Sequence, residues 1–507
     1  MHQEHEYIVV GGGTSGVIVA ARLAEAGADV GLIEAGPSGE HDPRILEYRR
    51  WSALLGSDYD YDYTIAPQAR GNSAIRHARA RVLGGCSSHN SVIAIASPAS
   101  DLRRWEAMGA SGWGPEGTAA AFRRVFERVA VTMPPPLNPC AVAFMAAAAD
   151  AGFPPADLRH PDVVDASAWL PLNVSGEIRQ SSAVAYLFPL AAPRPRPTLY
   201  TSTTVTRITL DESGRASGVL TSHGPIRARQ EVILCAGAFD SPKLLMLSGI
   251  GPADHLRALG LPTLVDLPAV GEHLQDHIEC VAIWEAQHPI PPLGSQRWEN
   301  GLFARFEPGA ESFEMMMHFG SEPYYIDFAA LGYPAAIPEH AFCMTPNVAR
   351  PRSEGVVRLR SADPAAPPLI DPRYFSDPGG YDERVLVEGL RLARAIASRP
   401  ALAAWAAREV LPGPDCQSDE ALGRYARHTS NTVYHPAGTC RMGPASSDDA
   451  VVTPTLCVRG VEGLRVADAS VFPTMIGVNL CMTVMMIGEK CAELVLAGAG
   501  SPASASA

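Results

Sequence analysis

The sequence lacks the features of a membrane-embedded, secreted or nucleic-acid-binding protein. No uninterrupted apolar run reaches the roughly 20 residues that span a bilayer. The acidic start MHQEHEYIVV has neither the basic beginning nor the apolar stretch of a signal peptide. A net charge of −13 provides no excess of basic residues for phosphate contacts. We therefore expect no nucleic-acid partner and no membrane partner.

The ten cysteines contain no Cys-x-x-Cys pair. In a chain of 507 residues this spacing indicates reduced thiols and predicts a cytoplasmic protein. The composition, 47% hydrophobic and 19% charged, is that of a globular protein, and the sequence has no internal repeat. At roughly 150 residues per domain, the length predicts two or three domains with a large core.

The first 33 residues have the pattern of a βαβ unit, which predicts an α/β fold. Tyr7–Val10 and Val30–Ile33 are short apolar runs, and residues 15–26 between them place apolar side chains at helical spacing. The aromatic and methionine-containing stretch 289–338 predicts an irregular segment that forms a pocket or a lid. Further strands are predicted at 199–209, 216–222 and 231–235, and helices at 384–396, 401–410 and 483–496.

The clearest motif is Gly11-x-Gly13-x-x-Gly16, between the first strand and the first helix. The first glycine permits a tight turn, the second lets a pyrophosphate approach the backbone, and the third lets the helix pack on the strand. Glu34 ends the next strand, where a carboxylate can accept hydrogen bonds from ribose hydroxyls. This context predicts dinucleotide binding without separating FAD from NAD.

Other segments allow two interpretations each. His89 lies in a stretch of small residues at 79–90, and its spacing alone favours a hydrogen-bonded core histidine. Residues 236–251 follow a strand and begin an apolar helix, which suits either cofactor packing or a simple connection. His273 and His277 have the spacing of metal ligands on one helix face, but the sequence offers no obvious third ligand.

One further histidine is a candidate for acid–base catalysis. His435 lies in a loop bounded by Pro436 and Gly438. Loop histidines of this kind serve catalysis about as often as they serve structure, so the spacing leaves both roles open.

These segments occur in the order found in the glucose–methanol–choline (GMC) oxidoreductases, and the chain resembles that family from Tyr7 to about Leu496. Within the family it is most similar to members that act on choline. The longest similar stretches are RARVLGGCSSHNS from Arg79, PKLLMLSGIGP from Pro242, TPNVARPRSEGVVRLRS from Thr345, IDPRYFSDPGGYD from Ile370, NTVYHP from Asn431, LRVADAS from Leu464 and TVMMIGEKCAEL from Thr483.

The resemblance implies a Rossmann-like FAD-binding domain interleaved with an α+β substrate-binding domain. The FAD-binding domain would comprise residues 1–150, 198–277 and 440–500, and the substrate-binding domain residues 151–197 and 278–439. Residues 501–507 are small and polar, which predicts a disordered tail. A homodimer is one option for the assembly.

The resemblance also implies oxidation of a primary alcohol to an aldehyde, with continuation to the acid as an option. Molecular oxygen would be the acceptor and hydrogen peroxide the product. Choline or a similar cationic amino alcohol is the favoured substrate, and an aryl, furanic or sugar alcohol is the alternative. A different class remains open, because some relatives hold FAD and cleave cyanohydrins without redox chemistry.

The family pattern assigns roles to individual residues. His435 would take the hydroxyl proton, and Asn479 would hydrogen-bond the alcohol or the flavin edge. His318 would help to hold the alkoxide, while Ser91 and Val433 would lie beside the reacting centre.

The same pattern implies a cage for a cationic substrate, with Glu285 facing the positive charge. The aromatic walls of this cage would be Trp51, Trp298 and Tyr324. His89 would be bonded covalently to the flavin. The FAD contacts implied by the resemblance are Gly11, Gly13, Ser15, Gly16, Glu34, Ala35, Gly84, Gly85, Ser87, His89, Asn90, Val205, Ala236, Gly237, Asp468, Ala469 and Asn479.

Overall fold

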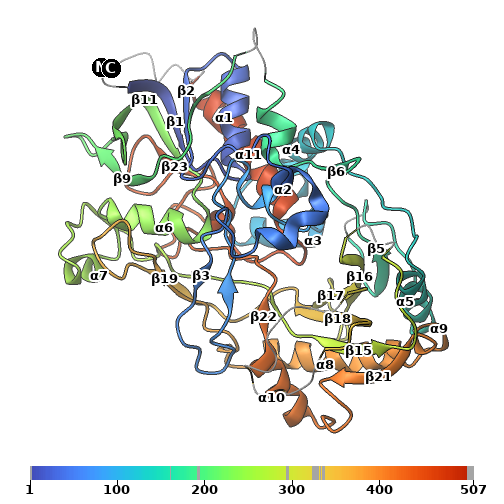
Figure 1. The fold of residues 1–507 in the computed structure, drawn as a ribbon. Coiled ribbons are helices and arrows are strands. Elements are labelled where there is room, and N and C mark those ends of the chain that lie inside the picture. The colour runs from blue at the N-terminus through green and yellow to red at the C-terminus, as the bar shows by residue number, and fades with distance from the viewer. Residues whose placement is uncertain are drawn as a thin grey trace.

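The computed structural model describes residues 3–159, 162–190, 195–292, 296–322, 331, 333 and 337–499. Two large sheets form two layers, one in the upper half and one in the lower half of Figure 1, and the chain passes between them several times. Tyr324 and the predicted tail at 501–507 lie outside the described residues.

The first sheet is mainly parallel, and its strands run in the order β8-β2-β1-β11-β10-β9, with β23 beside β11. β1 pairs in parallel with both β2 and β11, whereas β9, β10 and β11 form an antiparallel meander. The central strands are buried, which explains the continuous apolar run Tyr7–Val10. The strands are β1 (Gln3–Val10), β2 (Val30–Ile33), β8 (Thr198–Tyr200), β9 (Val205–Leu210), β10 (Ala216–Thr221), β11 (Gly224–Leu234) and β23 (Leu464–Val466).

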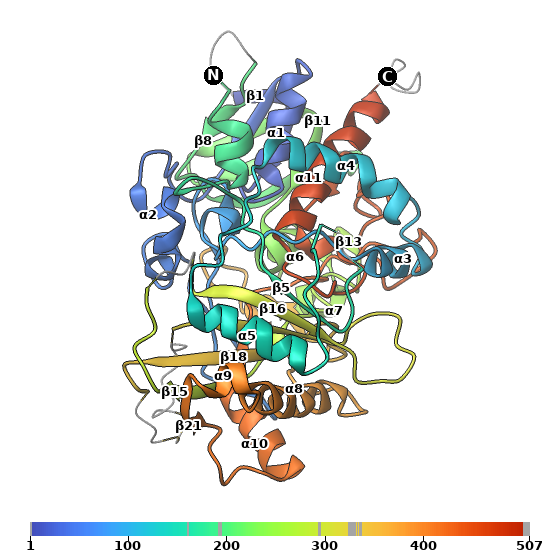
Figure 2. The ribbon, with the colours of Figure 1, turned by 90° about the vertical axis from the view of Figure 1, so that its right-hand side faces the viewer.

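Three helices are stacked beside this sheet, and α1 (Gly16–Glu25) contacts its strands β1 and β2. α1 also packs against α11 (Cys481–Ala499), and α11 packs in turn against α4 (Pro115–Arg128). Figure 2 shows the three helices side by side in the upper layer. Since α1 and α11 come from opposite ends of the chain, their contact brings the first glycine motif close to the segment that contains Asn479.

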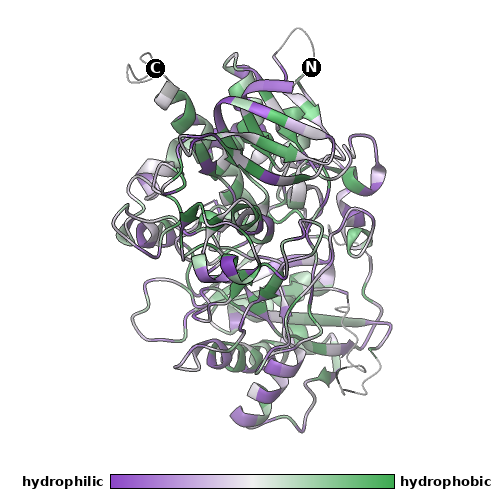
Figure 3. Ribbon diagram, turned by 90° about the vertical axis from the view of Figure 1, so that its left-hand side faces the viewer, coloured by the Kyte–Doolittle hydropathy of each residue, from purple (hydrophilic) through white to green (hydrophobic). Residues whose placement is uncertain are grey.

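The second sheet is antiparallel, and its strands run in the order β21-β15-β18-β17-β16-β5, with β14 beside β18 and β22. α8 (Tyr381–Ala397) packs on β17 and β18 through a face of apolar side chains spaced at helical intervals. Figure 3 shows this pattern, because helices at the lower edge alternate between green and purple segments while the strands are mostly green. The strands are β5 (Ala166–Trp169), β14 (Ile278–Glu279), β15 (Ala282–Ala286), β16 (Trp298–Ala304), β17 (Met315–Gly320), β18 (Ala341–Val348), β21 (Ala406–Leu411) and β22 (Asn431–Thr432).

The remaining described elements lie outside the two large sheets and the helices named above. They are α2 (Pro43–Leu46), η1 (Tyr48–Leu54), β3 (Tyr63–Thr64), β4 (Arg76–His77), η2 (Gly85–Ser88), α3 (Ala99–Ala107), α5 (Pro139–Asp150), β6 (Val174–Ser175), β7 (Ile178–Arg179), η3 (Ala183–Leu187), α6 (Gly237–Leu247), β12 (Ile250–Gly251), α7 (Ala253–Ala258), β13 (Val265–Asp266), β19 (Val356–Arg358), β20 (Leu369–Asp371), α9 (Pro400–Ala403), α10 (Asp419–Thr429) and η4 (Ala469–Val471).

The predicted βαβ unit is confirmed, but three predictions of local structure are wrong. The single strand predicted at 199–209 is two strands, β8 and β9, separated by a turn at 201–204. The helix predicted at 401–410 ends at Ala403, and β21 follows it because its backbone pairs with β15. The stretch 289–338 is not irregular throughout, since it contains β16 and β17. The methionines of β17 belong to a strand that is buried along its whole length.

The two sheets follow the interleaving expected of the two domains. The exact boundaries stay a prediction. α5, which lies within the range predicted for the FAD-binding domain, packs against β5, β16 and α9 of the lower layer. No disulfide joins any of the ten cysteines, all of which lie within the described residues. Among the described helices, none is both long enough and apolar enough to cross a bilayer.

Candidate active site

A cavity of about 500 Å³ lies between the two layers and contains most of the predicted site residues. One end is lined by the turn after β1 and by the turn between β11 and α6. The other end is lined by Trp298, His318 and residues 433–436. Because both sheets contribute to its walls, the cavity can place a cofactor held by the upper layer against a substrate held by the lower one.

The glycines of the first motif have different structural roles. A Cβ added to Gly16 would lie 2.0 Å from the carbonyl oxygen of Gly11, so a side chain there would push α1 off the strand. Gly11 has a φ of +97°, and its added Cβ would lie 2.5 Å from the Cys235 carbonyl oxygen. Gly13 lines the cavity, and its added Cβ would meet only the Cys235 oxygen at 3.5 Å. Gly13 thus keeps the backbone open toward a ligand.

A second glycine segment completes this end of the cavity. A Cβ on Gly85 would lie 2.6 Å from the Cα of Gly13, so the two glycine segments pack backbone to backbone. Gly13 and Thr14 directly precede α1, where unpaired N–H groups and the helix dipole favour an anionic ligand. The site therefore fits the pyrophosphate of a dinucleotide.

Glu34 supports the glycine turn. Its carboxylate accepts hydrogen bonds from the backbone N–H of Gly12 at 2.9 Å and of Gly36 at 2.8 Å. Burial raises the pKa of this carboxyl to about 7. The side chain ties the turn to β2, while its predicted contact with a ribose stays a prediction.

The predicted FAD contacts divide into two groups. Those that line the cavity are Gly13, Gly85, Ser87, His89, Asn90, Ala236, Gly237, Ala469 and Asn479. Those outside its lining are Gly11, Ser15, Gly16, Glu34, Ala35, Gly84, Val205 and Asp468. Some of the second group hold the walls together, since the Ser15 hydroxyl donates to the Ala467 carbonyl and Asp468 accepts from the Gly237 N–H.

His89 lies in the cavity wall as a neutral imidazole. Its Nε2 donates to the carbonyl of Leu54 at 3.1 Å, and burial lowers its pKa to about 4. A neutral ring with one nitrogen occupied by this bond keeps a lone pair on the other nitrogen. His89 is therefore chemically able to form a bond to an electrophilic carbon.

His435 is oriented by a second buried histidine. The Nδ1 atoms of His435 and His277 lie 2.8 Å apart, and Nε2 of His277 lies 2.8 Å from the Ile476 carbonyl and 3.0 Å from the Ala349 carbonyl. Carbonyls only accept, so Nε2 of His277 carries a proton. Its Nδ1 then accepts the Nδ1 proton of His435, which leaves Nε2 of His435 unprotonated.

Electrostatics favour the same neutral state. Burial lowers the pKa of His435 well below the ordinary value, and the neighbouring His277 lowers it further. Burial also lowers the pKa of His318 to about 4. At neutral pH, both rings are therefore uncharged, and His435 is available as a base.

Two polar atoms among the cavity-lining residues have no hydrogen-bond partner within the part of the chain that the structure describes. They are Nε2 of His318 and Oδ1 of Asn479. The side chains of His318 and Asn479 also interact with each other. Because a buried polar atom without a partner costs free energy, these two atoms are candidates to hydrogen-bond a ligand. Ser91 and Val433 line the same cavity, as predicted for residues beside the reacting centre.

The aromatic cage is present in part. Trp51 and Trp298 both line the cavity. The guanidinium of Arg297 lies 5.9 Å from the Trp51 ring centroid and pairs with Glu322 at 2.8 Å. The cavity thus has aromatic walls with an ion pair beside them.

Glu285 contradicts its predicted role. It lies on β15 outside the cavity lining, and its carboxylate pairs with Arg408 of the neighbouring strand β21 at 2.6 Å. Three acids line the cavity, Asp240, Glu279 and Glu322, and Glu279 among them is 5% exposed. β14 places it there by pairing with β22, directly before Val433. Sequence analysis missed Glu279, although it follows His277 by only two residues.

His273 and His277 do not lie on one helix face. Residues 271–277 do not form a helix, and His273 has a φ of +58°. His273 contacts Glu354 at 2.7 Å, whereas His277 contacts His435. The two rings therefore have separate partners and do not share one face.

Comparison with known proteins identifies the family. Residues 5–279 and 351–488 match the sequence models of GMC oxidoreductases. The chain belongs to the GMC oxidoreductase family, and it is an FAD-dependent alcohol oxidoreductase similar to choline oxidase.

Individual relatives match nearly the whole length of this chain. The chain is 46% identical to choline oxidase of Arthrobacter globiformis, covering 97% of this chain and 94% of that protein. It is 32% identical to mitochondrial choline dehydrogenase of Homo sapiens, covering 97% and 90% respectively. The crystal structure of pyridoxine 4-oxidase from Mesorbium loti superposes with a TM-score of 0.89 at 30% identity, covering 96% and 98%.

Proposed function

We propose that this enzyme oxidises the primary alcohol of choline, or of a similar cationic amino alcohol, to the aldehyde with molecular oxygen as acceptor. The observation that supports this substrate most directly is the buried carboxylate of Glu279 in the same cavity as Trp51 and Trp298. Aromatic faces and one carboxylate together recognise a quaternary ammonium. The similarity to choline oxidase supports the same substrate class.

The residues of the cavity suggest how the alcohol is activated. Nε2 of His435 takes the hydroxyl proton, because His277 holds the other ring nitrogen in its protonated form. Nε2 of His318 would donate to the resulting oxygen, whereas Oδ1 of Asn479 would accept from the alcohol before its proton leaves or from the flavin edge. Bound FAD supplies a two-electron acceptor for the hydride that leaves the substrate carbon.

The FAD would extend from the start of α1 to His435. Gly13, Gly85 and Gly237 would lie against its pyrophosphate end, and His89 would lie near the ring system. We infer a covalent bond between His89 and a carbon of the flavin, since the buried neutral ring has an unprotonated nitrogen. The new bond would replace a C–H bond, with the proton lost to solvent and the electron pair passed through the flavin to molecular oxygen, the proposed acceptor. Hydrogen peroxide is the expected product, and a second oxidation of the hydrated aldehyde would give the acid.

Anaerobic mixing of the purified holoenzyme with choline tests the proposal directly. Rapid loss of the oxidised flavin absorbance, followed by recovery on admitting oxygen with release of peroxide, is the expected result. A flavin that stays oxidised with choline but bleaches with uncharged alcohols would exclude the cationic substrate. Bleaching without reoxidation by oxygen would indicate another electron acceptor.

An aromatic alcohol is the second candidate. The structural similarity to pyridoxine 4-oxidase and the two tryptophans of the cavity favour it. A cyanohydrin-cleaving lyase would leave the flavin oxidised with every alcohol, so the same experiment separates the classes. The homodimer and the cytoplasmic location stay predictions, which light scattering and cell fractionation would test.

A further inference from the structure

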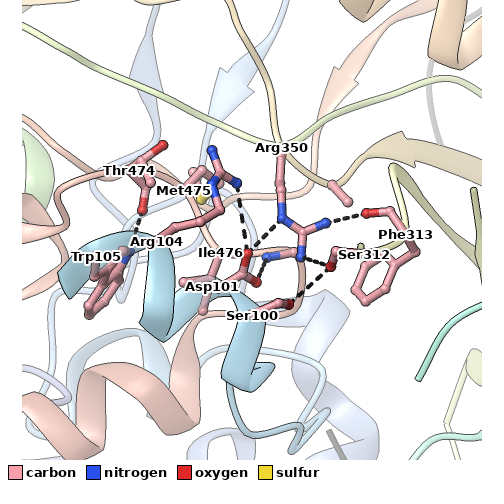
Figure 4. A network of polar contacts seen from close by, with 12 residues as sticks. Ser100, Asp101, Arg104, Trp105, Ser312, Phe313, Arg350, Thr474, Met475 and Ile476 are labelled. Atoms are coloured by element: carbon pink, nitrogen blue, oxygen red, sulfur yellow. Dashed lines mark hydrogen bonds and ion pairs between the residues drawn. The ribbon is translucent and has the colours of Figure 1, made fainter. Parts of the chain in front are cut away.

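A buried carboxylate on α3 connects the two layers behind the histidine pair. Asp101 is 1% exposed, and its two oxygens have different partners. Nε of Arg350 donates to Oδ1 at 2.6 Å (Figure 4). The backbone N–H of Gly477 donates to Oδ2 at 2.7 Å. Arg350 follows β18 of the lower sheet, and Gly477 belongs to the segment that leads to Asn479.

The same two segments contact His277 from their other side. The carbonyl that precedes Gly477 is that of Ile476, and the carbonyl that precedes Arg350 is that of Ala349. Both carbonyls accept from Nε2 of His277. The Ile476–Gly477 peptide is therefore held at its N–H by Asp101 and at its C=O by His277.

Neighbouring contacts keep this arrangement rigid. Arg350 also donates to the Phe313 carbonyl and to the Ser312 hydroxyl, and the Trp105 indole donates to the Thr474 carbonyl at 2.8 Å (Figure 4). These bonds join α3, the segment before β17 and the segment before Asn479. The guanidinium of Arg350 balances the buried negative charge.

We propose that Asp101 is a positioning residue for the base His435, acting through the Ile476–Gly477 peptide and His277. By fixing that peptide, Asp101 keeps the Ile476 carbonyl aimed at Nε2 of His277. The proton on this nitrogen then determines which nitrogen of His435 is free to accept the hydroxyl proton. The inference rests on the proposed function and names the residue that orients its base.

Other charged and titratable groups also face the histidine pair. The charges of Asp276, His318 and Arg79 shift the pKa of His435. Those of Asp276 and Asp101 shift the pKa of His277. Asp276 accepts directly from the backbone N–H of His435 at 2.9 Å, whereas the hydrogen-bonded route from Asp101 to His277 runs through the Ile476–Gly477 peptide. Burial lowers the pKa of His277, and the charge of Asp101 partly opposes this.

The test is Asp101→Asn, with Asp382→Asn as the matched control. An amide accepts through one oxygen only, so Asn would turn its NH₂ toward either Arg350 or Gly477, both donors. Asp382 is equally buried and accepts two backbone N–H groups, from Arg352 and Ser353. Asp101→Asn should lower the anaerobic rate of flavin reduction by about 10-fold to 100-fold, with unchanged substrate Kd and FAD content. Asp382→Asn should reduce flavin at the wild-type rate.

A double-variant cycle then tests the route through His277. If Asp101 acts through that ring, Asp101→Asn combined with His277→Gln should be no slower than His277→Gln alone. The proposal would be overturned if the losses in the rate of flavin reduction multiply in the double variant, or if Asp101→Asn reduces flavin at the wild-type rate. Should Asp101→Asn not fold, Arg350→Lys, which removes the Nε donor, replaces it with the same expectation.

Crystal structures of the variants separate this proposal from the substrate assignment. Asp101→Asn should show a displaced Ile476–Gly477 peptide and a turned His277 ring, whatever alcohol the enzyme accepts. An undisturbed peptide and ring would refute the positioning role. If no alcohol reduces the wild-type flavin, the proposed function fails, and the displacement still decides the role of Asp101.

Discussion

Replacing Glu279 by Gln tests the charge that the cavity offers to its substrate. The substitution keeps the size of the side chain and removes its negative charge, at a position that is 5% exposed. At about 5 Å and an effective dielectric constant of about 20, a carboxylate and an ammonium attract each other by about 3 kcal/mol. Because the bound groups lose hydration, a net loss of about 1–3 kcal/mol is expected for a cationic substrate.

This free energy corresponds to a rise in the Kd of choline of about 5-fold to 150-fold. The measurement is the substrate dependence of anaerobic flavin reduction, with choline and with its uncharged tert-butyl isostere. Only choline should bind more weakly to the variant, since the isostere has no charge to lose a partner. Flavin content should stay at the wild-type level.

Glu285→Gln is the matched control. Glu285 is also a strand glutamate, but it pairs with Arg408 outside the cavity. Its substitution should leave the Kd of choline unchanged. Equal weakening of choline and its isostere in Glu279→Gln, or weakening by Glu285→Gln alone, would refute the reasoning.

Three more predictions concern the histidines. His435→Ala should reduce flavin about 10²-fold to 10⁴-fold more slowly while keeping FAD, as stopped-flow absorbance would show, and an unchanged rate would remove His435 from the mechanism. After acid precipitation, FAD should remain with the wild-type chain and be released from the His89→Ala variant. Release from both proteins would exclude the covalent bond. Burial lowers the pKa of His318 to about 4, whereas histidine in an unfolded chain titrates near pH 6.5. Between about pH 6.5 and about pH 4 the unfolded chain therefore binds a proton at this position that the folded chain does not, and the free energy of unfolding should fall on acidification through this range. His318→Gln should flatten the dependence of Tm on pH, and an equally steep dependence would contradict this.

Contacts between residues close in the chain could be predicted from the sequence. Gly11, Gly13 and Gly16 lie within one turn between a strand and a helix, so their spacing alone indicates the geometry that the structure shows. The strand at Val30–Ile33 could also be predicted, because a short apolar run between polar residues is typical of a buried strand. Family resemblance then placed His435, Asn479 and His89 in one site, and the cavity contains all three.

Contacts between distant segments could not be predicted. Glu279 and Glu285 are six residues apart in similar apolar surroundings, and the sequence pattern does not separate them. Strand pairing does: β14 pairs with β22 beside Val433, whereas β15 pairs with the edge strand β21. The helix predicted at 401–410 failed for a related reason, since pairing with β15 outweighs a weak helical pattern in β21.

The sequence by itself determined the βαβ start, the dinucleotide motif and the identity of the candidate base. Only the tertiary structure decided that His277 orients His435 and that Asp101 holds the Ile476–Gly477 peptide, which contacts His277. These contacts join residues separated by 158 and 376 positions in the chain. Local patterns contain no information on such pairs, because their proximity results from the packing of two layers and from the burial of polar groups that must find partners.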